Sequence, residues 1–452
     1  MKKGMFFALA ASSLLFSACS SDDAVVSTVG QNEAVQQIVL QVASSGDGLT
    51  TRAGRPLYSS QALQTIQNVC VVIYKDDATK AIVKKVKKDW TKSSTYDNHG
   101  RQLTLTLKGD ERLDAGNYKV MAVGYSEGSD YEYSLDVTSA NALTGNYSDI
   151  TATLEANKAA EEVFAGDAAL TIGADKKITN LNKGEENGVA VTLHRQVAGS
   201  FGYFQNIPAK VNGKTAKTLR LVVRDKNDKL TFNNFNSSFT ANGATGSTVK
   251  YYVNGSTSTG AALATTDKFF NGDNGYVLYS INLNTWFPGG DQNNDGVLNA
   301  EDTNWDHPAD VKTQVVKGSV FGSSFIIPFN LTTGKNTMEL QLLADDGEII
   351  KTWTVSIPAS DVNSDDTKGA TDVSPYIFNV VRNHMYNLGV KTSTGTTTDP
   401  DPSNPTPDPK PGPDPVDPTP GTDQPEDLSK SQNLILKVND NWELIHKLEL
   451  GD

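Results

Sequence analysis

The sequence is poor in cysteine and lacks any concentration of positive charge. Among its 452 residues only Cys19 and Cys70 are cysteines. Because Cys19 falls within a predicted leader, the folded part keeps one cysteine and cannot form an internal disulfide. The formal net charge is −13, and no cluster of Lys and Arg stands out, whereas nucleic-acid-binding proteins neutralise phosphates with dense basic patches. The composition therefore predicts a protein that is held together by its own core and does not bind nucleic acid.

Motifs that carry catalysis are also missing. The sequence has no Gly-x-Ser-x-Gly elbow, no phosphate-binding loop and no Cys–His pairing suited to nucleophilic catalysis. Its five histidines are scattered without the spacing of a zinc site. We therefore predict no catalytic residues and expect the protein not to be an enzyme. The alternative is a sandwich-type glycosidase, whose pair of carboxylates leaves no local signature.

Apolar runs are short, and the longest of them lies at the N-terminus. Lys2 and Lys3 precede an apolar stretch over residues 5–16, which has the design of a signal peptide and is too short for a membrane span. The stretch ends in Ser17-Ala18-Cys19, and small residues before a cysteine resemble a bacterial lipobox. That resemblance implies cleavage before Cys19 and lipidation of its thiol. The alternative is an ordinary signal peptide with an incidental cysteine.

Most of the remaining chain alternates apolar and polar residues with a period of two, which is typical of β-strands. Ile38, Leu40 and Val42 share one face of a predicted first strand, and a Gly/Ser/Thr-rich loop over residues 44–56 follows it. Similar alternation marks residues 103–107, 116–123, 219–223, 276–281 and 338–342. Asn-Gly pairs such as Asn212-Gly213 punctuate these stretches as turns. A stretch near Leu154–Val163 is the one candidate for a short helix.

This pattern predicts an all-β protein with two tandem β-sandwich domains of the transthyretin-like or Greek-key kind. Two halves of this length suit typical domain sizes, and we place the boundary near His194. Residues 394–428 are rich in Pro, Asp, Thr and Gly and predict an extended spacer. The predicted organisation is a signal peptide (1–19), a propeptide with the first strand (20–52), an N-terminal sandwich (53–193), a C-terminal sandwich (194–393), the spacer (394–428) and a donor-strand segment (429–452).

The segment after the spacer is strongly amphipathic with a period of two. Its apolar residues fall on even positions, with Ile435 and Ile445 as exceptions. The even-numbered set is Leu434, Leu436, Val438, Trp442, Leu444, Leu448 and Leu450. Such a strand is not stable alone in water, so it must pack either on its own chain or on another.

A twelve-residue acidic segment has the spacing of a calcium-binding loop. Hard Ca²⁺ requires many oxygen ligands, and Gly296 would provide the sharp turn at the sixth position. Asp in the last position resembles dockerin-type loops, but dockerins carry such loops in pairs and this chain has one. The alternative is an acidic turn without metal. The predicted ligands are Asp291, Asn293, Asp295, the carbonyl of Val297, Asn299 and Asp302.

Taken together, these features resemble the FimA-type fimbrillins, the type V pilins of Bacteroidales. The resemblance rests on the lipoprotein leader, the first strand with its Arg-containing loop, and Arg195-x-Val197-Ala198 after a strand. It also rests on the run 381–388 (VRNHMYNL), the Pro-rich spacer and the Trp-containing terminal strand. The overlay covers nearly the whole chain, but between these motifs it is a match of pattern.

The resemblance implies an assembly mechanism and a set of partners. A trypsin-like protease would cut the loop after Arg52, before Ala53; Arg55 is the other candidate, but Pro56 follows it and usually blocks such cleavage. The first strand would then leave, and the terminal strand of another subunit would fill its groove. The expected partners are other fimbrial subunits, including anchor and tip proteins, and the outer membrane, which holds the lipidated precursor before it joins an extracellular fimbrium. We expect a stalk subunit, and the alternative is a monomeric outer-membrane lipoprotein that acts as an adhesin or glycan-binding module.

Overall fold

The computed structural model describes a part of the chain that is almost entirely β-structure, which confirms the predicted fold class. Within the described residues the helices are α1 (Leu283–Trp286) and the single-turn 3-10 helix η5 (Gly109–Glu111). The described ranges are 35–42, 66–90, 102–134, 146–148, 150–180, 188–224, 226–232, 255–256, 268–271, 275–306, 308, 315–330, 338–356, 379–380, 382, 385–390, 423–430, 434–435 and 437–439.

Seven strands form the sheet of one lobe, in the order β3-β2-β5-β8-β9-β1-β4. The sheet is divided into two parts, because β8 and β9 pair through only two residue pairs, Phe164 with Arg195 and Ala165 with His194. Both parts contribute to one apolar cluster, so they pack as a sandwich. The strands are β1 (Gln36–Val42), β2 (Asn68–Lys75), β3 (Ile82–Asp89), β4 (Gln102–Leu107), β5 (Gly116–Tyr125), β8 (Val163–Ile172) and β9 (Gly188–Arg195).

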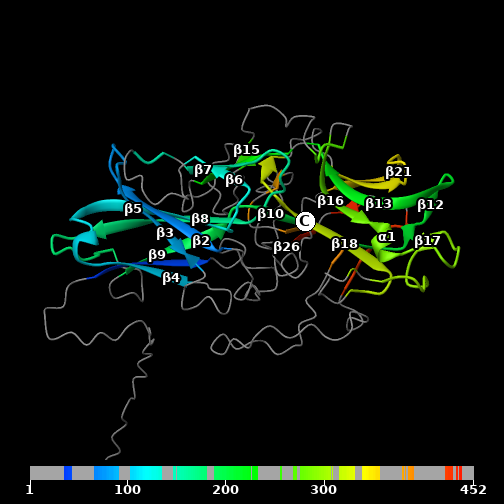
Figure 1. Ribbon diagram of the computed structural model, residues 1–452, viewed down its shortest axis with the longest axis horizontal. Coiled ribbons are helices and arrows are strands. Elements are labelled where there is room, and N and C mark those ends of the chain that lie inside the picture. The colour runs from blue at the N-terminus through cyan, green and yellow to red at the C-terminus, as the bar shows by residue number, and fades with distance from the viewer. Residues whose placement is uncertain are drawn as a thin grey trace, which may run out of the picture.

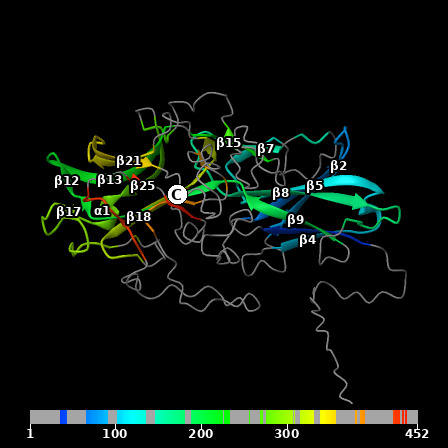
Figure 2. The same ribbon diagram turned by 180° about the vertical axis from the view of Figure 1, so that it is seen from behind.

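A small sheet covers the outer face of this lobe and joins it to the second half of the chain. Its order is β15-β14-β7-β6, and β14 pairs with β7 although the two lie in different halves of the sequence. Figures 1 and 2 show β7 and β15 near the middle of the elongated molecule. The strands are β6 (Tyr131–Tyr133), β7 (Ile150–Leu154), β14 (Lys229–Phe232) and β15 (Gly255–Ser256).

Two further sheets pack together in the second lobe. One has the order β18-β10-β23-β26, with β24 also paired to β10; the other has the order β12-β13-β20-β21-β25, with β16 paired to β13. Short pairs link β11 with β17 and β19 with β22. The strands are β10 (Ala198–Gln205), β11 (Ile207–Pro208), β12 (Lys210–Val211), β13 (Lys214–Val223), β16 (Tyr276–Asn282), β17 (Val297–Leu298), β18 (Ser319–Ile326), β19 (Phe329–Asn330), β20 (Met338–Ala344), β21 (Ile349–Ser356), β22 (Asn379–Val380), β23 (Met385–Leu388), β24 (Glu426–Asp427), β25 (Leu434–Ile435) and β26 (Lys437–Asn439).

The side-chain alternation of strands decides which residues reach which core. In β2 the odd-numbered Val69, Val71 and Ile73 enter the sandwich cluster of the first lobe. The even-numbered Cys70 and Val72 enter the larger cluster that continues into the second lobe. Cys70 is fully buried, as predicted for a small core residue. Both faces of the β2 layer are therefore covered, which explains why this strand is a continuous apolar run.

Of two local predictions from the sequence, the Asn-Gly turn is confirmed and the short helix is wrong. Asn212 and Gly213, with φ angles of 49° and 82°, form the hairpin turn between β12 and β13, as an Asn-Gly pair favours. The predicted short helix near Leu154–Val163 is wrong, because Leu154 ends β7 and Val163 begins β8. Leu154 and Val163 are buried as strand residues, so tertiary packing overrides the weak helical preference.

Candidate functional site

Strand β1 lies in the interior of the seven-stranded sheet, although it is the first strand of the described residues. Residues 37–42 pair in parallel with residues 188–193 of β9, and residues 36–41 pair in antiparallel with residues 102–107 of β4. In Figures 1 and 2 it is the dark blue strand beside β9 and β4. Taking β1 out would therefore leave a slot with two unpaired strand edges.

The side chains of β1 make this slot a part of the core. Ile38 and Leu40 are fully buried in the sandwich cluster, which confirms that they share an inward face. Full burial of one such side chain contributes roughly 1.5–3 kcal/mol. At the other end of the strand Gln41 is exposed, and its Nε2 donates to Thr192 Oγ1 at 3.1 Å. The side chain of Val42 lies outside the described residues.

The segments on both sides of β1 lie outside the described residues. These segments include Cys19, Arg52, Ala53 and Arg55. Lipidation and cleavage therefore stay predictions from the sequence.

The terminal segment, residues 423–439 where described, packs on the second lobe of its own chain. Val390 and Gln424 exchange two backbone hydrogen bonds of 2.8 and 2.7 Å. β24 then pairs in parallel with Phe204 and Gln205 of β10, just beyond the residues of β10 that pair with β23. Leu428, which follows β24, is fully buried. Residues 423–428, which the sequence assigns to the spacer, thus hold the chain against β10.

Two short strands follow at the edges of the second lobe. In β25, Leu434 pairs with Val355 of β21, and its side chain is 1% exposed within the core. In β26, Val438 pairs with Tyr386 of β23. The structure therefore places the first of the predicted polymerisation residues inside its own chain. Leu436, Trp442, Leu444, Leu448 and Leu450 lie outside the described residues.

Two signature arginines each make a buried polar contact, Arg195 at the end of β9 and Arg382 with Gln196, the residue that follows Arg195. Arg195 Nε donates to Glu162 Oε1, and its guanidinium lies 4.9 Å from the ring centroid of Phe164. Arg382 Nη1 donates to Gln196 Oε1 at 3.1 Å. Arg195, Glu162, Gln196 and Arg382 are all at most 4% exposed. The sequence pointed to both arginines but not to their partners, because Gln196 falls on the unspecified position of Arg195-x-Val197-Ala198 and Glu162 lies far from Arg195 in the chain.

The predicted calcium loop has a defined fold held by its own polar side chains. The Gly296 amide donates to Asp291 Oδ2 at 2.9 Å, the Asp295 amide to Asn293 Oδ1 at 3.0 Å, and the Val297 amide to Asp295 Oδ1 at 2.8 Å. The Val297 amide, together with the side chains of Asn293 and Asn299, lowers the pKa of Asp295. Asp295 is therefore held in its ionised form.

One oxygen of this loop has no partner. Asp291 Oδ1 is buried and accepts no hydrogen bond. Asp302 is fully buried, and its two oxygens accept the amides of Gln292 and Asn299, each at 2.9 Å; each carboxylate oxygen keeps a second lone pair. Across the described ranges, no group of three or more His, Cys, Asp or Glu is arranged to hold a metal. A cation here would thus depend on amide and carbonyl oxygens as well as carboxylates.

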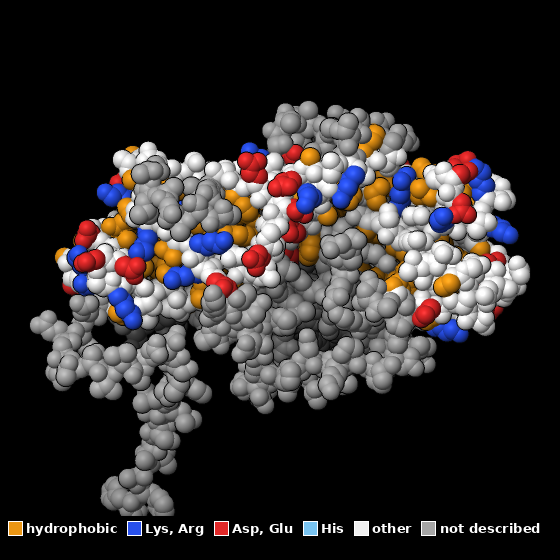
Figure 3. All heavy atoms as spheres, viewed as in Figure 1, with side chains coloured by type: hydrophobic (Ala, Val, Ile, Leu, Met, Phe, Trp, Pro, Cys, Tyr) orange, Lys and Arg blue, Asp and Glu red, His pale blue; other side chains and the backbone are white. Residues whose placement is uncertain are grey.

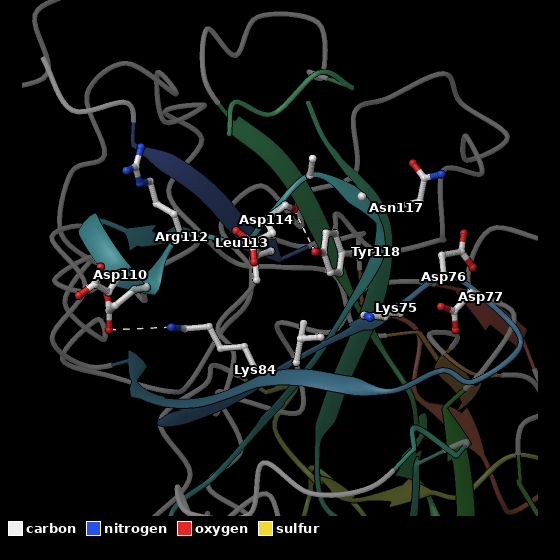
Figure 4. A pocket seen from close by; sticks show the side chains of 14 residues that line it. Lys75, Asp76, Asp77, Lys84, Asp110, Arg112, Leu113, Asp114, Asn117 and Tyr118 are labelled. Carbon is white, nitrogen blue, oxygen red and sulfur yellow. Dashed lines mark hydrogen bonds and ion pairs between the residues drawn. The ribbon is translucent and has the colours of Figure 1, made fainter. Parts of the chain in front are cut away.

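A polar pocket of about 620 Å³ lies at the end of the first lobe. Lys84, Asp110, Arg112, Asp114 and Tyr118 are among the residues around it (Figure 4). Charges of both signs are also interspersed across the face of the molecule in Figure 3. The helices in the described part of the chain are a single turn long, so none of them could cross a membrane.

Comparison with known proteins gives structural matches but no sequence match. The sequence matches no protein-family model and no curated protein. A candidate cell adhesion protein from Parabacteroides distasonis ATCC 8503 is 11% identical with a TM-score of 0.38, covering 90% of this chain and 99% of that one. A fimbrial assembly protein from the same strain is 13% identical with a TM-score of 0.32, covering 80% and 92%. The tip fimbrial protein Mfa3 from Porphyromonas gingivalis, truncated at its C-terminus, is 10% identical with a TM-score of 0.34, covering 78% and 94%. These values are too low to assign the chain to a family.

Proposed function

We propose that the chain is a structural subunit of a surface fimbria that polymerises by strand exchange and has no enzymatic activity. The observation that carries this proposal is the position of β1. It is the first of the described strands, yet it is paired on both edges inside the sheet and buries Ile38 and Leu40. A cut between β1 and β2 would separate it covalently from the folded body and leave every other strand of that body connected.

The vacated slot would suit a strand from another subunit. Its walls are the edges of β9 and β4, which supply backbone hydrogen bonds, and its floor is the apolar cluster under Ile38 and Leu40. This is the geometry of β-strand addition, in which main-chain bonds give affinity and pockets for alternate side chains give specificity. The entering strand would be the terminal segment of a neighbour, with Trp442, Leu444, Leu448 and Leu450 on its inward face.

The docking of the terminal segment limits which residues are donated. Leu434 is buried in its own lobe and β26 ends at Asn439, so we propose that the donated part is residues 440–452. Extended, residues 440–452 span about 40 Å. We further propose that the precursor is lipidated at Cys19, held at the outer membrane, and released into the extracellular fimbrium by a trypsin-like protease acting at Arg52-Ala53. The final partners are other subunits of the same fimbria.

The test compares two arginine variants of the same loop. Surface material from Arg52→Ala should stay a lipid-anchored monomer, whereas Arg55→Ala, the control, should give a ladder of multimers on SDS gels run without boiling. N-terminal sequencing of wild-type polymer should find Ala53 first. Mature polymer that still begins before Ile38 would overturn the proposal, because β1 would then still be present.

One observation favours a second function. Leu428 and Leu434 bury the terminal segment in its own lobe, as expected of a subunit that does not donate a strand. Such a protein would be a tip subunit or a monomeric, membrane-tethered adhesin. It would give no multimer ladder from its own chain, and membrane fractions would retain it.

We also propose that the loop from Asp291 to Asp302 binds one Ca²⁺ that stabilises the second lobe. The buried, unpartnered Asp291 Oδ1 and the ionised Asp295 support this. The remaining ligands would be Asn293, Asn299 and the Val297 carbonyl, with Asp302 sharing its oxygens between the ion and two amides. Each of these is a hard oxygen ligand of the kind that Ca²⁺ prefers.

Calcium binding is tested on the full chain by calorimetry and thermal melting. Wild-type protein should melt at a higher temperature in millimolar Ca²⁺ than in EDTA, because a ligand that binds only the native state stabilises it. Asp291→Asn should abolish the difference. Glu301→Gln, a neighbouring position outside the ligand set, should keep it. Identical wild-type melts in Ca²⁺ and EDTA, with no heat of binding, would show that the loop is only an acidic turn.

A further inference from the structure

The first residue of β1 makes contacts unlike those of any other side chain described in that strand. Gln36 is polar but only 1% exposed. Its Oε1 accepts the amide of Leu113 at 2.8 Å, while its Nε2 donates to the Leu113 carbonyl at 3.0 Å and to the Lys176 carbonyl at 2.9 Å. The exchange with Leu113 reproduces, through a side chain, the pair of hydrogen bonds that two strands would share.

These bonds tie β1 to two loops that its strand pairing does not reach. Leu113 follows η5 and lies on the wall of the polar pocket in Figure 4. Lys176 lies in the turn after β8, and its Nζ pairs with Asp114 Oδ1 at 2.8 Å. Both loops therefore converge on Gln36, whereas Gln41 at the opposite end makes one exposed hydrogen bond.

The apolar residues of β1 cannot fix its register by themselves. A slip by one residue is prevented because it would turn Ile38 and Leu40 out of the core. A slip by two residues keeps aliphatic side chains facing inward and is not prevented by alternation. It would, however, place Ile38 against Leu113 and leave the buried amide and carbonyl of Leu113 and the part-buried carbonyl of Lys176 without the hydrogen bonds of Gln36, which is unfavourable.

We propose that Gln36 fixes the register of β1 and controls its release, and that a replacing strand is selected for a side chain at this position that both donates and accepts hydrogen bonds. The selection rests on the proposed strand exchange, whereas the control of release does not. Gln432, Leu434 and Leu436 have the spacing of Gln36, Ile38 and Leu40, but Leu434 is buried in its own lobe. Among residues 440–452, His446 precedes Leu448 and Leu450 with the same spacing.

This spacing identifies one strand to fill the place of β1 and the direction in which that strand runs. A neutral imidazole has one donor and one acceptor, whereas the carboxylate of Asp440 in the other such set among residues 440–452, Asp440-Trp442-Leu444, has acceptors alone. The entering strand is the terminal segment of a second copy, with His446 at the place of Gln36. It runs in the direction of β1, parallel to β9.

Release of β1 is measured on the full chain after a single cut. Residues 50–55 are replaced by the recognition sequence of a site-specific protease, the chain is nicked, and β1 is chased with an excess of a fluorescent peptide of residues 34–43. Gln36→Leu should release β1 roughly 10- to 100-fold faster than wild type, since three hydrogen bonds are lost. Gln41→Leu, the matched control in the same strand, should change the rate by about twofold or less. Equal rates for the two variants would overturn the proposal.

A second measurement does not depend on nicking. In the intact chain, Gln36→Glu keeps the acceptor for the Leu113 amide but loses the donor to two carbonyls. Hydrogen exchange of the Leu113 amide should therefore rise less in Gln36→Glu than in Gln36→Leu. Unchanged exchange at Leu113 in both variants would show that Gln36 does not hold this loop.

Displacement of β1 by peptides tests the role of Gln36 separately from the proposed donation of the terminal segment. A peptide of residues 440–452 should displace β1 from the nicked protein, and the same peptide with His446→Leu should do so roughly tenfold less effectively, while Lys447→Leu should be neutral. Equal displacement by the first two peptides would overturn the selection at His446. If no terminal peptide displaces β1 while Gln36→Leu still releases it faster, donation by the terminal segment fails and the role of Gln36 stands.

Discussion

The two segments that strand exchange would move are held in opposite ways. β1 lies between two strands and pairs over six residues with each of them. β25 and β26 lie at sheet edges and pair with one neighbour each, over two and three residues. A strand that is fixed on both edges needs a specific event to leave, whereas an edge strand can detach at low cost. Under the proposed strand exchange, this asymmetry would place the control of assembly on β1.

The apolar contacts follow the same asymmetry, with one exception. β1 contributes Ile38 and Leu40 to the sandwich cluster, and Leu434, the one residue of β25 and β26 whose side chain is described, enters the cluster of the second lobe. Leu428, just before them, is also fully buried. The described part of the terminal segment is thus anchored to its own lobe at Leu428 and Leu434.

The largest expected effect comes from breaking the apolar face of β1. Ile38→Asp would bury an unpaired charge in the sandwich cluster and should destabilise the first lobe by more than about 3 kcal/mol. Gln41→Asp, at the exposed end of the same strand, should change stability by about 0.5 kcal/mol or less. Urea denaturation followed by circular dichroism measures both. A similar loss in the two variants would mean that β1 is not held by its inward face.

An intermediate effect is expected from cutting back the terminal segment. A chain that ends at Asn439 keeps Leu434 and should melt like the full chain, but should not polymerise. A chain that ends at Leu428 exposes the site of Leu434, and we expect it to lose roughly 2 kcal/mol of stability. Thermal melts and unboiled SDS gels distinguish the two. Normal multimers from the chain ending at Asn439 would show that residues 440–452 are not the joint.

The sequence predicted which residues form strands and which way they face better than it predicted which strands pair with each other. Alternation identified the inward faces of β1 and β13 because a side-chain period of two is a local property. It could not predict that β1 inserts between β9 and β4, or that β14 completes a sheet with β7, because pairing partners are set by the whole fold. The same limit applies to Leu434, because alternation alone does not say whether it packs on another subunit or, as the structure has it, on its own lobe.

The candidate functional residues also differ in how far the sequence predicts them. The calcium loop and the signature arginines have local patterns that the sequence displays. Gln36 has none, since a polar residue at the start of a strand is usually exposed. Its one signal is that it shares the even numbering of Ile38 and Leu40, and that signal becomes meaningful only when Leu113 and Lys176 are known to lie beside it.

The smallest expected effect concerns the pH dependence of the terminal anchor. Burial acts to raise the pKa of Asp427, but hydrogen bonds from Ser429 and Lys430 outweigh it and lower that pKa below its ordinary value of 3.8. A carboxyl group with a lowered pKa contributes stability that is complete above its ordinary value and is lost as the pH falls through the pKa in the folded state. The terminal anchor should therefore be unaffected between pH 7 and pH 5 and should loosen in acid below 3.8. The Leu428 amide, which donates to the Gln205 carbonyl at 3.0 Å, reports on this by hydrogen exchange. At pH 5 it should exchange faster in Asp427→Asn than in wild type, and the two rates should converge as the pH falls further; a constant ratio would show that the charge of Asp427 does not hold the anchor.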